Sequence, residues 1–600
     1  MAQMTKSKTD KSAQSLMLKA FAAYERQDIS LATTLCDEVL AASSEQPDAW
    51  MLRGVLYRRA GDIPAAVRAY SKAITLKPDY LEAWMNLGNI HASGKQWDAA
   101  ARAYEQVLRI KPDHLQGWSS LGRLCIDQHD FSRGLNALRQ ALALQPGYLE
   151  AGNLLGWALC LMGHPQEALP ILRRALLDHP GNAVVLRNQL LALACQPDAE
   201  DAEMAAALRN WLAANVGKVT RLTLPAPIPR EGRRLRVAYV CSRFGHIATV
   251  GFGLAPFLHH NRKAFQVFAY HDGRQGGGQA ERFRAEADVW RETWALDDKS
   301  FCEQVIRDQI DVLVDMSGPM EGRNRLLALA CKPAPVQVSW LGRLATTALS
   351  TMDVIVGDSE VCLANSEPFM SEAVLRMPFG FTCWEPPEER MPPTGKPPAL
   401  ASGHITFGSF NPVESLNDAV IRLWASILSA CPASRLVCKA AAFVDGFVRR
   451  DVEQRFAVCG ISRDRLDLQQ APPYQSLMKS YQGIDIALDP FPLSGKAAAC
   501  DALWMGLPVL TLRGERSAQN HTASVLVAAG FGEWVANTEA EYRDRALAWV
   551  ADIEQLRVWR SSLRDILPDS PLCGGEFFTR HLEIHYRRLW DAWASSQEIS

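Results

Sequence analysis

A short segment that joins a strand pattern to a helix pattern through glycine is the first candidate for chemistry. Ser494, Gly495 and Lys496 follow an apolar run that ends at Leu488, and a helix pattern begins at Ala497. Such a corner directs unpaired backbone N–H groups and the positive end of the helix dipole at one point. An anionic group such as a sugar-nucleotide diphosphate binds well there, and the Lys496 charge would add to the attraction. Plain α/β scaffold is the alternative interpretation of the same segment.

Other patterns that signal a particular chemistry are missing from the chain. Neither G-x-x-x-x-G-K-[ST] nor G-x-S-x-G occurs, which disfavours P-loop and serine-hydrolase chemistry. Asp-x-Asp is absent as well, so a metal-dependent nucleotide-sugar site of that type is not supported. The fourteen cysteines form no C-x-x-C pair, which favours reduced, buried thiols over a zinc site or a disulfide framework. We therefore expect no metal and no bound cofactor.

His246 is the one histidine that we consider as a catalytic base. It lies in the turn after the first predicted strand, ahead of Gly251-Phe252-Gly253. Ala255 and Pro256 occupy the later positions of a G-x-G-x-x-G fingerprint, so a dinucleotide site is a weak interpretation. A surface or turn histidine is the alternative for His246, and we assign no general base.

Length and composition set the broad class of protein. The 600 residues suggest about four domain-sized units, and 48% apolar with 22% charged residues is typical of a soluble globular chain. A formal net charge of −2 argues against a general nucleic-acid binder. The start of the chain lacks the apolar stretch of a signal peptide, and no apolar run is long enough to span a bilayer. We expect a cytoplasmic protein without a membrane segment.

The first third of the chain repeats every 34 residues. The repeated positions hold proline (Pro78, Pro112, Pro146, Pro180), glycine (Gly54, Gly88, Gly122, Gly156) and tryptophan (Trp50, Trp84, Trp118). This is the tetratricopeptide pattern of paired helices, and we expect it to cover residues 14–216. Stacked repeats leave a concave surface that holds extended peptide, so a client protein is the expected partner. A dimerisation or spacing element is the alternative, and a homodimer through the repeats stays open.

The rest of the chain alternates strand and helix patterns in two blocks. We predict a linker and two lobes, each a doubly wound α/β sheet, that face one another across a cleft. The predicted divisions are linker 217–234, N-terminal lobe 235–384, Pro-rich linker 385–404, C-terminal lobe 405–572 and terminal helix segment 573–600. The predicted strands are Leu235–Cys241, Gln266–His271, Asp311–Met316, Val336–Trp340, Val354–Val356, Ile405–Phe410, Arg435–Cys438, Leu466–Leu468, Ile484–Leu488 and Val509–Leu512.

Several long motifs together resemble one family. These are PAPVQVSWLGRLATT (333–347), ITFGSFN (405–411), DIALDPFPLSGKAAACDALWMGLPVLTL (485–512) and the terminal SPLCGGEFFTRHLEIHYRRLW, all following the repeat array. The combination is similar to the O-linked N-acetylglucosaminyltransferase/SPINDLY family, and most similar to its bacterial branch. The resemblance implies an α-solenoid followed by a GT-B fold of two Rossmann-like lobes. It also implies inverting, metal-independent transfer of a sugar from a nucleotide donor to Ser or Thr of a protein held by the repeats. Flagellin is one client that bacterial relatives modify.

The family's site residues are only partly kept. Asn411, Gly495 and Asp501 match the family's asparagine, turn glycine and aspartate at the donor. Elsewhere the residues differ: Ala497 and Ala498 replace paired threonines at the diphosphate, Ser415 a lysine, Leu477 a stacking histidine, and Ile247 and Pro319 two further histidines. Losing an ionic contact to phosphate typically costs a few kcal/mol, so these changes are not neutral for an enzyme that uses the same donor.

Two hypotheses follow from the replaced residues. In the first, Lys496, Arg343 and His246 rebuild the site for another activated sugar, such as a nonulosonic acid. In the second, catalysis is lost and the chain is a pseudo-glycosyltransferase whose repeats bind a client. The predicted donor site comprises seven residues: Asn411, Gly495, Lys496, Ala497, Ala498, Asp501 and Arg343.

Overall fold

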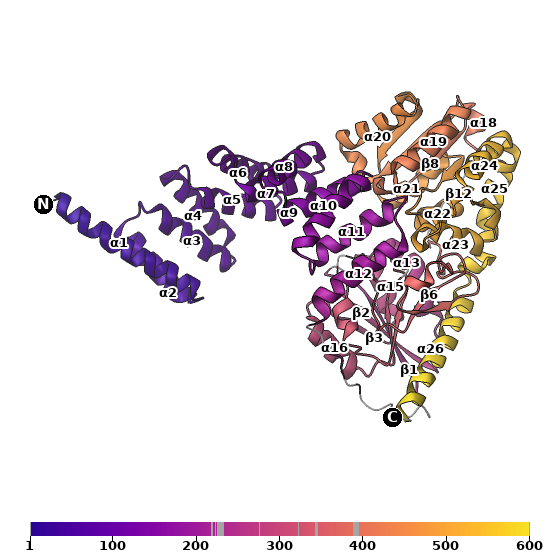
Figure 1. Cartoon of the computed structure of the whole chain (residues 1–600), viewed down its shortest axis with the longest axis horizontal. Helices are drawn as coiled ribbons and strands as arrows, with labels where there is room; N and C mark the ends of the chain where they lie inside the picture. The colour runs from indigo at the N-terminus through magenta and orange to yellow at the C-terminus, as the bar shows by residue number, and fades with distance from the viewer. Residues whose placement is uncertain are drawn as a thin grey trace. The chain divides into compact units, whose positions relative to one another are not determined.

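The computed structural model of the chain describes residues 2–217, 220–222, 224, 233–274, 277–321, 323–342, 346–387 and 395–598. Contacts within the chain divide it into two compact units, Met1–Leu155 and Gly156–Ser600. The predicted repeat array extends to residue 216, and its last helices belong by their contacts to the second unit. Figure 1 labels the elements of both units.

The first unit consists of antiparallel helix pairs. Its helices are α1 (Ala2–Glu25), α2 (Ile29–Ala42), α3 (Pro47–Arg59), α4 (Ile63–Leu76), α5 (Leu81–Ser93), α6 (Trp97–Ile110), α7 (Leu115–Asp127), α8 (Phe131–Leu144) and the start of α9 (Leu149–Leu161). Side chains of Asp28, Asp62 and Asp130 cap the second helix of a pair by accepting a backbone N–H. The short loops and regular lengths confirm the tetratricopeptide prediction.

The repeated glycines lie where the two helices of a pair cross. A Cβ atom at Gly54 would lie 2.5 Å from the Tyr70 ring, and one at Gly88 would lie 2.6 Å from the Tyr104 ring. Gly122 stands in the same relation to Leu138, at 2.6 Å. Real Cβ contacts are not this short, so only glycine lets the large side chain of the second helix pack against the first.

The second unit begins with the last repeat helices. After α9 come α10 (Pro165–Asp178), α11 (Ala183–Cys195) and α12 (Asp201–Val216). The buried guanidinium of Arg516 donates to the carbonyls of Leu193 (2.9 Å) and Gln196 (2.8 Å). The buried Asn417 amide likewise donates to the Cys195 carbonyl. These bonds join α11 to the C-terminal lobe.

The N-terminal lobe is a parallel sheet of seven strands in the order β3-β2-β1-β4-β5-β6-β7. The strands are β1 (Leu235–Cys241), β2 (Phe265–His271), β3 (Val289–Glu292), β4 (Val312–Asp315), β5 (Val336–Ser339), β6 (Val354–Gly357) and β7 (Ala373–Arg376). Helices α13 (Ile247–Gly253), α14 (Ala255–His259), α15 (Gly277–Glu286), α16 (Asp298–Arg307) and α17 (Leu326–Ala330) connect them.

The C-terminal lobe is a second parallel sheet, in the order β10-β9-β8-β11-β12-β13. Its strands are β8 (Thr406–Ser409), β9 (Arg435–Ala440), β10 (Leu466–Gln470), β11 (Ile486–Leu488), β12 (Val509–Leu512) and β13 (Val535–Ala536). Its helices are α18 (Ala399–Ser402), α19 (Asp418–Ala430), α20 (Gly446–Val458), α21 (Tyr474–Ser480), α22 (Lys496–Trp504), α23 (His521–Ala528), α24 (Glu539–Ala551) and α25 (Ile553–Ile566). Two such lobes confirm the predicted GT-B fold class.

The terminal helix α26 (Gly575–Glu598) leaves the C-terminal lobe and runs along the N-terminal one, as Figure 1 shows. Phe578, Leu582 and Tyr586 join the N-terminal lobe core, and the Trp590 indole donates to Asp311 at 3.0 Å. The helix therefore packs through its apolar face. Of the helices in the described ranges, none combines the length and apolarity that crossing a bilayer requires.

Candidate active site

A cavity of about 340 Å³ lies between the two lobes. Val250, Gly251 and Arg282 line it from α13 and α15 of the N-terminal lobe. From the C-terminal lobe, Ala497 and Asp501 on α22 line it together with α21. The N-terminal half of α22, the helix that follows the glycine corner, therefore faces the space between the lobes.

Asp489 stabilises the turn at Gly495 by hydrogen bonding. It follows β11, is buried, and accepts the Gly495 N–H at 2.9 Å and the Thr511 hydroxyl at 2.8 Å. Burial raises the pKa of the Asp489 carboxyl to about 6, although both hydrogen bonds act in the opposite direction. Gly495 is the N-cap residue of α22, and no side chain of the described residues caps this helix. The first turn of α22 thus keeps the amide donors that an anion would use.

Asn411 supports the corner through packing. A Cβ atom at Gly495 would lie 1.8 Å from the Asn411 Oδ1, so this side chain occupies the space that glycine leaves. Asn411 follows β8, is buried, and its amide donates to the Ser409 hydroxyl at 3.3 Å. It is not among the described residues that line the cavity. The structure thus places Asn411 against the turn.

Lys496 reaches across to the other lobe. Its Nζ lies 4.8 Å from the ring centroid of Phe252 and 4.8 Å from that of Phe381. Both rings belong to the N-terminal lobe and are buried. Two cation–π contacts therefore fix the ammonium group at the beginning of α22.

Asp501 brings a carboxyl group to the cavity wall. The Tyr474 hydroxyl donates to its Oδ1 at 2.8 Å. Burial raises the pKa of the Asp501 carboxyl to about 7, and this hydrogen bond opposes the rise. Ala497 lines the same cavity, whereas the Ala498 carbonyl accepts the Tyr481 hydroxyl at 3.2 Å and this residue borders a small internal space instead.

The other residues that the sequence analysis named differ in where they lie. His246 is exposed and caps α13, where its Nδ1 accepts the Ala248 N–H at 3.3 Å. Ser415 is buried and donates to the Pro412 carbonyl at 2.6 Å. Ile247 lines the cavity. Arg343 lies outside the described residues, and the two predicted linkers, 217–234 and 385–404, fall partly outside them.

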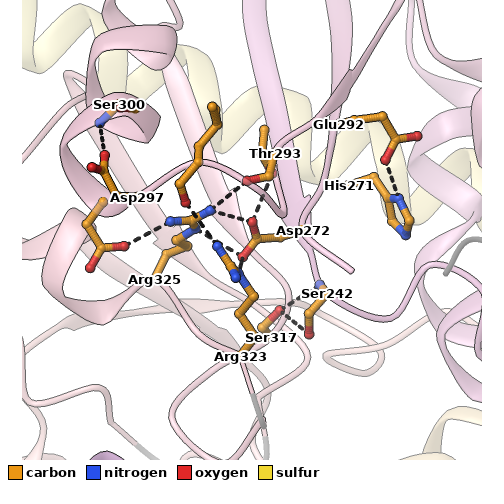
Figure 2. A network of polar contacts seen from close by, with 12 residues as sticks. Ser242, His271, Asp272, Glu292, Thr293, Asp297, Ser300, Ser317, Arg323 and Arg325 are labelled. Carbon is orange, nitrogen blue, oxygen red and sulfur yellow. Dashed lines mark hydrogen bonds and ion pairs between the residues drawn. The ribbon is translucent and has the colours of Figure 1, made fainter. Parts of the chain in front are cut away.

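A buried ionic cluster shapes the carboxyl edge of the N-terminal lobe (Figure 2). Asp272, directly after β2, accepts two bonds from the buried Arg325 guanidinium, at 2.6 and 3.0 Å, and one from Arg323 at 3.0 Å. The Thr293 hydroxyl, directly after β3, donates to the same carboxylate at 3.0 Å. The cluster ties the loops after β2 and β3 to the segment before α17, so the edge where ligands bind in such sheets is rigid.

Specific contacts join the lobes beside the cavity. The Ser524 hydroxyl of α23 donates to the buried Asp358 carboxylate after β6, at 2.5 Å. Arg513 pairs with Glu360 at 2.7 Å. The Trp384 and Trp504 rings meet edge to face, with centroids 5.7 Å apart. The structure therefore shows the lobes together rather than apart.

Sequence reasoning missed several residues of the site. The residues that were not predicted are Tyr474, Arg282, Phe252 and Phe381. Phe252 lies within Gly251–Gly253, the segment that only partly matches a dinucleotide fingerprint. Nothing in their spacing links them, because they come from four segments of two lobes. As for metals, no three His, Cys, Asp or Glu side chains in the described part of the chain lie close enough to hold an ion.

Comparison with known families finds matches along most of the chain. The model described as Glycosyl transferase family 41 matches residues 214–384 and 382–582. Models described as tetratricopeptide repeat match residues 17–80, 56–114 and 126–193.

Named relatives match about two thirds of the chain. A barley protein named "Probable UDP-N-acetylglucosamine--peptide N-acetylglucosaminyltransferase SPINDLY" is 34% identical over 414 residues, which are 67% of this chain and 43% of the barley protein. The Arabidopsis thaliana protein of the same name is 32% identical over 422 residues, 68% of this chain and 45% of that protein. The chain thus spans less than half the length of these plant relatives.

A solved structure resembles most of the chain. A mutant of Thermobaculum terrenum O-GlcNAc transferase superposes with a TM-score of 0.76 at 32% identity, covering 86% of this chain and 98% of that one.

Proposed function

The chain belongs to glycosyl transferase family 41, and from that membership we propose that it transfers a sugar from a nucleotide donor to a Ser or Thr hydroxyl of a client protein. The observation that carries the proposal is the cavity between the lobes, whose wall includes Ala497 and Asp501 of α22. A nucleotide sugar that binds there has its phosphate groups near the first turn of that helix.

We propose direct displacement as the mechanism. The acceptor hydroxyl attacks the anomeric carbon, and the bond to the leaving nucleotide breaks with inversion. Negative charge develops on the departing phosphate, where the α22 amides and Lys496 stabilise it more in the transition state than in the bound donor. Because these groups already supply positive charge, the proposed reaction uses no metal. We assign no proton acceptor, and His246 acts in the structure as a helix cap.

The proposed donor differs from UDP-N-acetylglucosamine. Ala497, Ala498 and Ser415 lack the hydroxyl or ammonium groups that the family resemblance implies at a diphosphate. Arg282 brings a guanidinium to the opposite wall of the cavity. A positive group there favours a sugar that carries its own carboxylate, such as a nonulosonic acid.

The proposed acceptor is a protein held by the repeats. Tetratricopeptide arrays bind extended peptide on their concave surface, and the glycine crossings that shape this surface are intact. Flagellin is the first client to test, because it is the client that the family resemblance suggests.

A catalytically inactive scaffold is the second candidate function. It is favoured by the replaced residues: Ala497, Ala498 and Ser415 lack the groups that the family resemblance implies at a diphosphate. In that case the repeats alone would carry the function, as a binding surface for the client.

Thermal stabilisation by nucleotide sugars separates the two functions. The purified chain is mixed with UDP-, GDP- and CMP-activated sugars, and both the unfolding temperature and the release of free nucleotide are measured. Stabilisation that is lost in Lys496→Ala and Asp501→Ala but kept in Lys299→Ala, an exposed lysine of α16, supports the enzyme. No stabilisation and no nucleotide release with any donor would favour the scaffold. Rapid transfer from UDP-N-acetylglucosamine would refute the proposed change of donor.

A further inference from the structure

We propose that Phe252 and Phe381 are positioning residues, which hold the Lys496 ammonium group where the donor's phosphate groups bind. The proposal rests on the proposed function, because it gives these rings a task only if a phosphorylated donor occupies the cavity. It goes further in one respect: a lysine carried by the C-terminal lobe is oriented by the N-terminal lobe. The charge is then in place only when the lobes are together.

The geometry places the ammonium group between two rings from separate segments. Phe252 lies on α13 and Phe381 in the segment after β7, and each ring centroid is 4.8 Å from the Lys496 Nζ. The distance is within the range in which an aromatic face attracts a cation. Phe252 is 2% and Phe381 3% exposed, so neither ring is free to move away from the lysine.

The surroundings fix Phe381 in particular. Its N–H donates to the Asp358 carboxylate at 2.7 Å, and its carbonyl accepts the Trp340 indole N–H at 2.8 Å. The imidazole of His521, the first residue of α23, lies 5.1 Å from its ring. The position of the Phe381 ring is therefore fixed by the hydrogen bonds of its own backbone and by contacts from both lobes.

The Asp358 carboxylate links the Phe381 segment to the contact between the two lobes. Asp358 accepts the Phe381 N–H and also the Ser524 hydroxyl of the other lobe. Separation of the lobes would break the second bond and remove Lys496 from both rings. The position of the cation therefore depends on how the lobes meet.

A phenyl ring attracts a cation without cancelling its charge, so the contacts with Phe252 and Phe381 do not themselves weaken the attraction of the Lys496 ammonium group for phosphate. A lysine side chain has large rotamer freedom, and holding it in advance reduces the entropy lost when the donor binds.

A lysine-selective NMR experiment tests the geometry without any donor. Reductive methylation with ¹³C-formaldehyde labels every lysine as a dimethylammonium, and ring currents from two phenyl groups are expected to shift the Lys496 signal upfield. The signal is assigned by its loss in Lys496→Arg. We expect it to move toward the ordinary lysine position in Phe252→Leu and in Phe381→Leu, and to stay in Phe268→Leu, which removes a buried ring elsewhere in the same lobe. An unshifted signal in the unaltered chain, or one insensitive to both substitutions, would overturn the proposal.

Transfer measurements test the function of the rings. With a donor that the screen identifies, we expect Phe252→Leu and Phe381→Leu to lower kcat/KM roughly 3- to 30-fold. In the Lys496→Met background the same substitutions are expected to change it less than about 2-fold, because the rings act through the lysine. Equal losses in both backgrounds would show a general structural effect and overturn the proposal.

A phosphate probe separates failure of this proposal from failure of the proposed function. If no donor supports transfer, the proposed function fails, and the labelled chain is titrated with inorganic pyrophosphate. Movement of the Lys496 signal, weaker in Phe381→Leu, would support the positioning of the cation for phosphate. An unmoved signal would overturn it.

Discussion

Gly495 shows how a single hydrogen atom in place of a methyl group determines the shape of the corner. Its backbone is not in the left-handed region, so the only obstacle to a side chain is the Asn411 Oδ1, 1.8 Å from an added Cβ. We expect Gly495→Ala to lower the free energy of unfolding by about 1–3 kcal/mol through overpacking. Gly483→Ala, in the same lobe with open space around its Cβ, is expected to change it by less than about 0.5 kcal/mol. Urea unfolding measures both, and equal effects would contradict the packing argument.

Asp501 gives a prediction about pH. Its pKa is about 7 in the folded chain against 3.8 for an ordinary aspartate, so between these values the folded state binds more protons than the unfolded state. Its contribution to the free energy of unfolding therefore falls as pH rises from about 4 to 7, by at most about 1.4 kcal/mol per pH unit. Asp489, with a pKa of about 6, contributes with the same sign.

The difference in free energy of unfolding between the unaltered chain and Asp501→Asn isolates the contribution of the Asp501 carboxyl. We expect the variant to gain stability relative to the unaltered chain as pH rises through this range, and the gain to level off above pH 7. Tyr474→Phe keeps Asp501 but removes the hydrogen bond that opposes the rise in pKa, so this variant should go on losing stability up to a higher pH than the unaltered chain does. Urea unfolding between pH 5 and 8 measures the three chains. A difference that does not change with pH would show that Asp501 is ionised throughout.

At the scale of elements, the repeat pairs depend on close helix crossing. A Cβ atom at Gly88 of α5 would lie 2.6 Å from the Tyr104 ring of α6, which is buried. We expect Gly88→Ala to lower the unfolding temperature of the repeats by several degrees, as an overpacked site does. Gly94→Ala, at the C-cap of the same helix with its nearest atom at 3.5 Å, should leave the temperature almost unchanged. Circular dichroism followed on heating compares the two variants. An equal fall in unfolding temperature in Gly94→Ala and Gly88→Ala would contradict a special role for the close crossing at Gly88.

The elements that the sequence predicted are those with a strong local pattern. All ten predicted strands correspond to strands of the structure within a few residues. Most of them are apolar runs buried on both faces, whereas β10 is an edge strand with exposed positions. The strands β3, β7 and β13 were missed. The first two are edge strands with exposed positions, and β13 has two residues. Their residues lack an apolar run, so only pairing with a neighbouring strand makes them strands.

The site was predictable only where one segment builds it. The corner at Gly495 and the helix after it follow from local sequence, and α22 begins within one residue of the prediction. The wall opposite does not, since Phe252 and Arg282 come from two segments of the other lobe. The approach of Phe252 and Phe381 to Lys496 depends on how two separately folded sheets meet, for which no spacing in the sequence is a guide.

At the scale of the molecule, the second unit joins repeat helices to both lobes. Arg516 connects α11 to the C-terminal lobe, and Ser366 of the N-terminal lobe donates to the buried Asp201 of α12 at 2.6 Å. The last repeat helices thus contact the two lobes that enclose the cavity. A client held by these helices would keep a fixed distance from the donor, which is the arrangement that transfer to a tethered protein needs.

Arg516 provides the test of this connection. Its guanidinium is buried against α11, and Arg516→Met would leave the carbonyls of Leu193 and Gln196 without these donors. An unsatisfied buried carbonyl costs about 1–3 kcal/mol, so we expect α11 and α12 to open locally before the lobes unfold. Hydrogen exchange followed by mass spectrometry should show faster exchange over residues 183–216, with the lobe strands unchanged. Arg557→Met, which removes an exposed ion pair of α25, is the control and should leave that exchange as it is. Unchanged protection of 183–216 in Arg516→Met would mean that other contacts suffice to hold the repeats on the lobes.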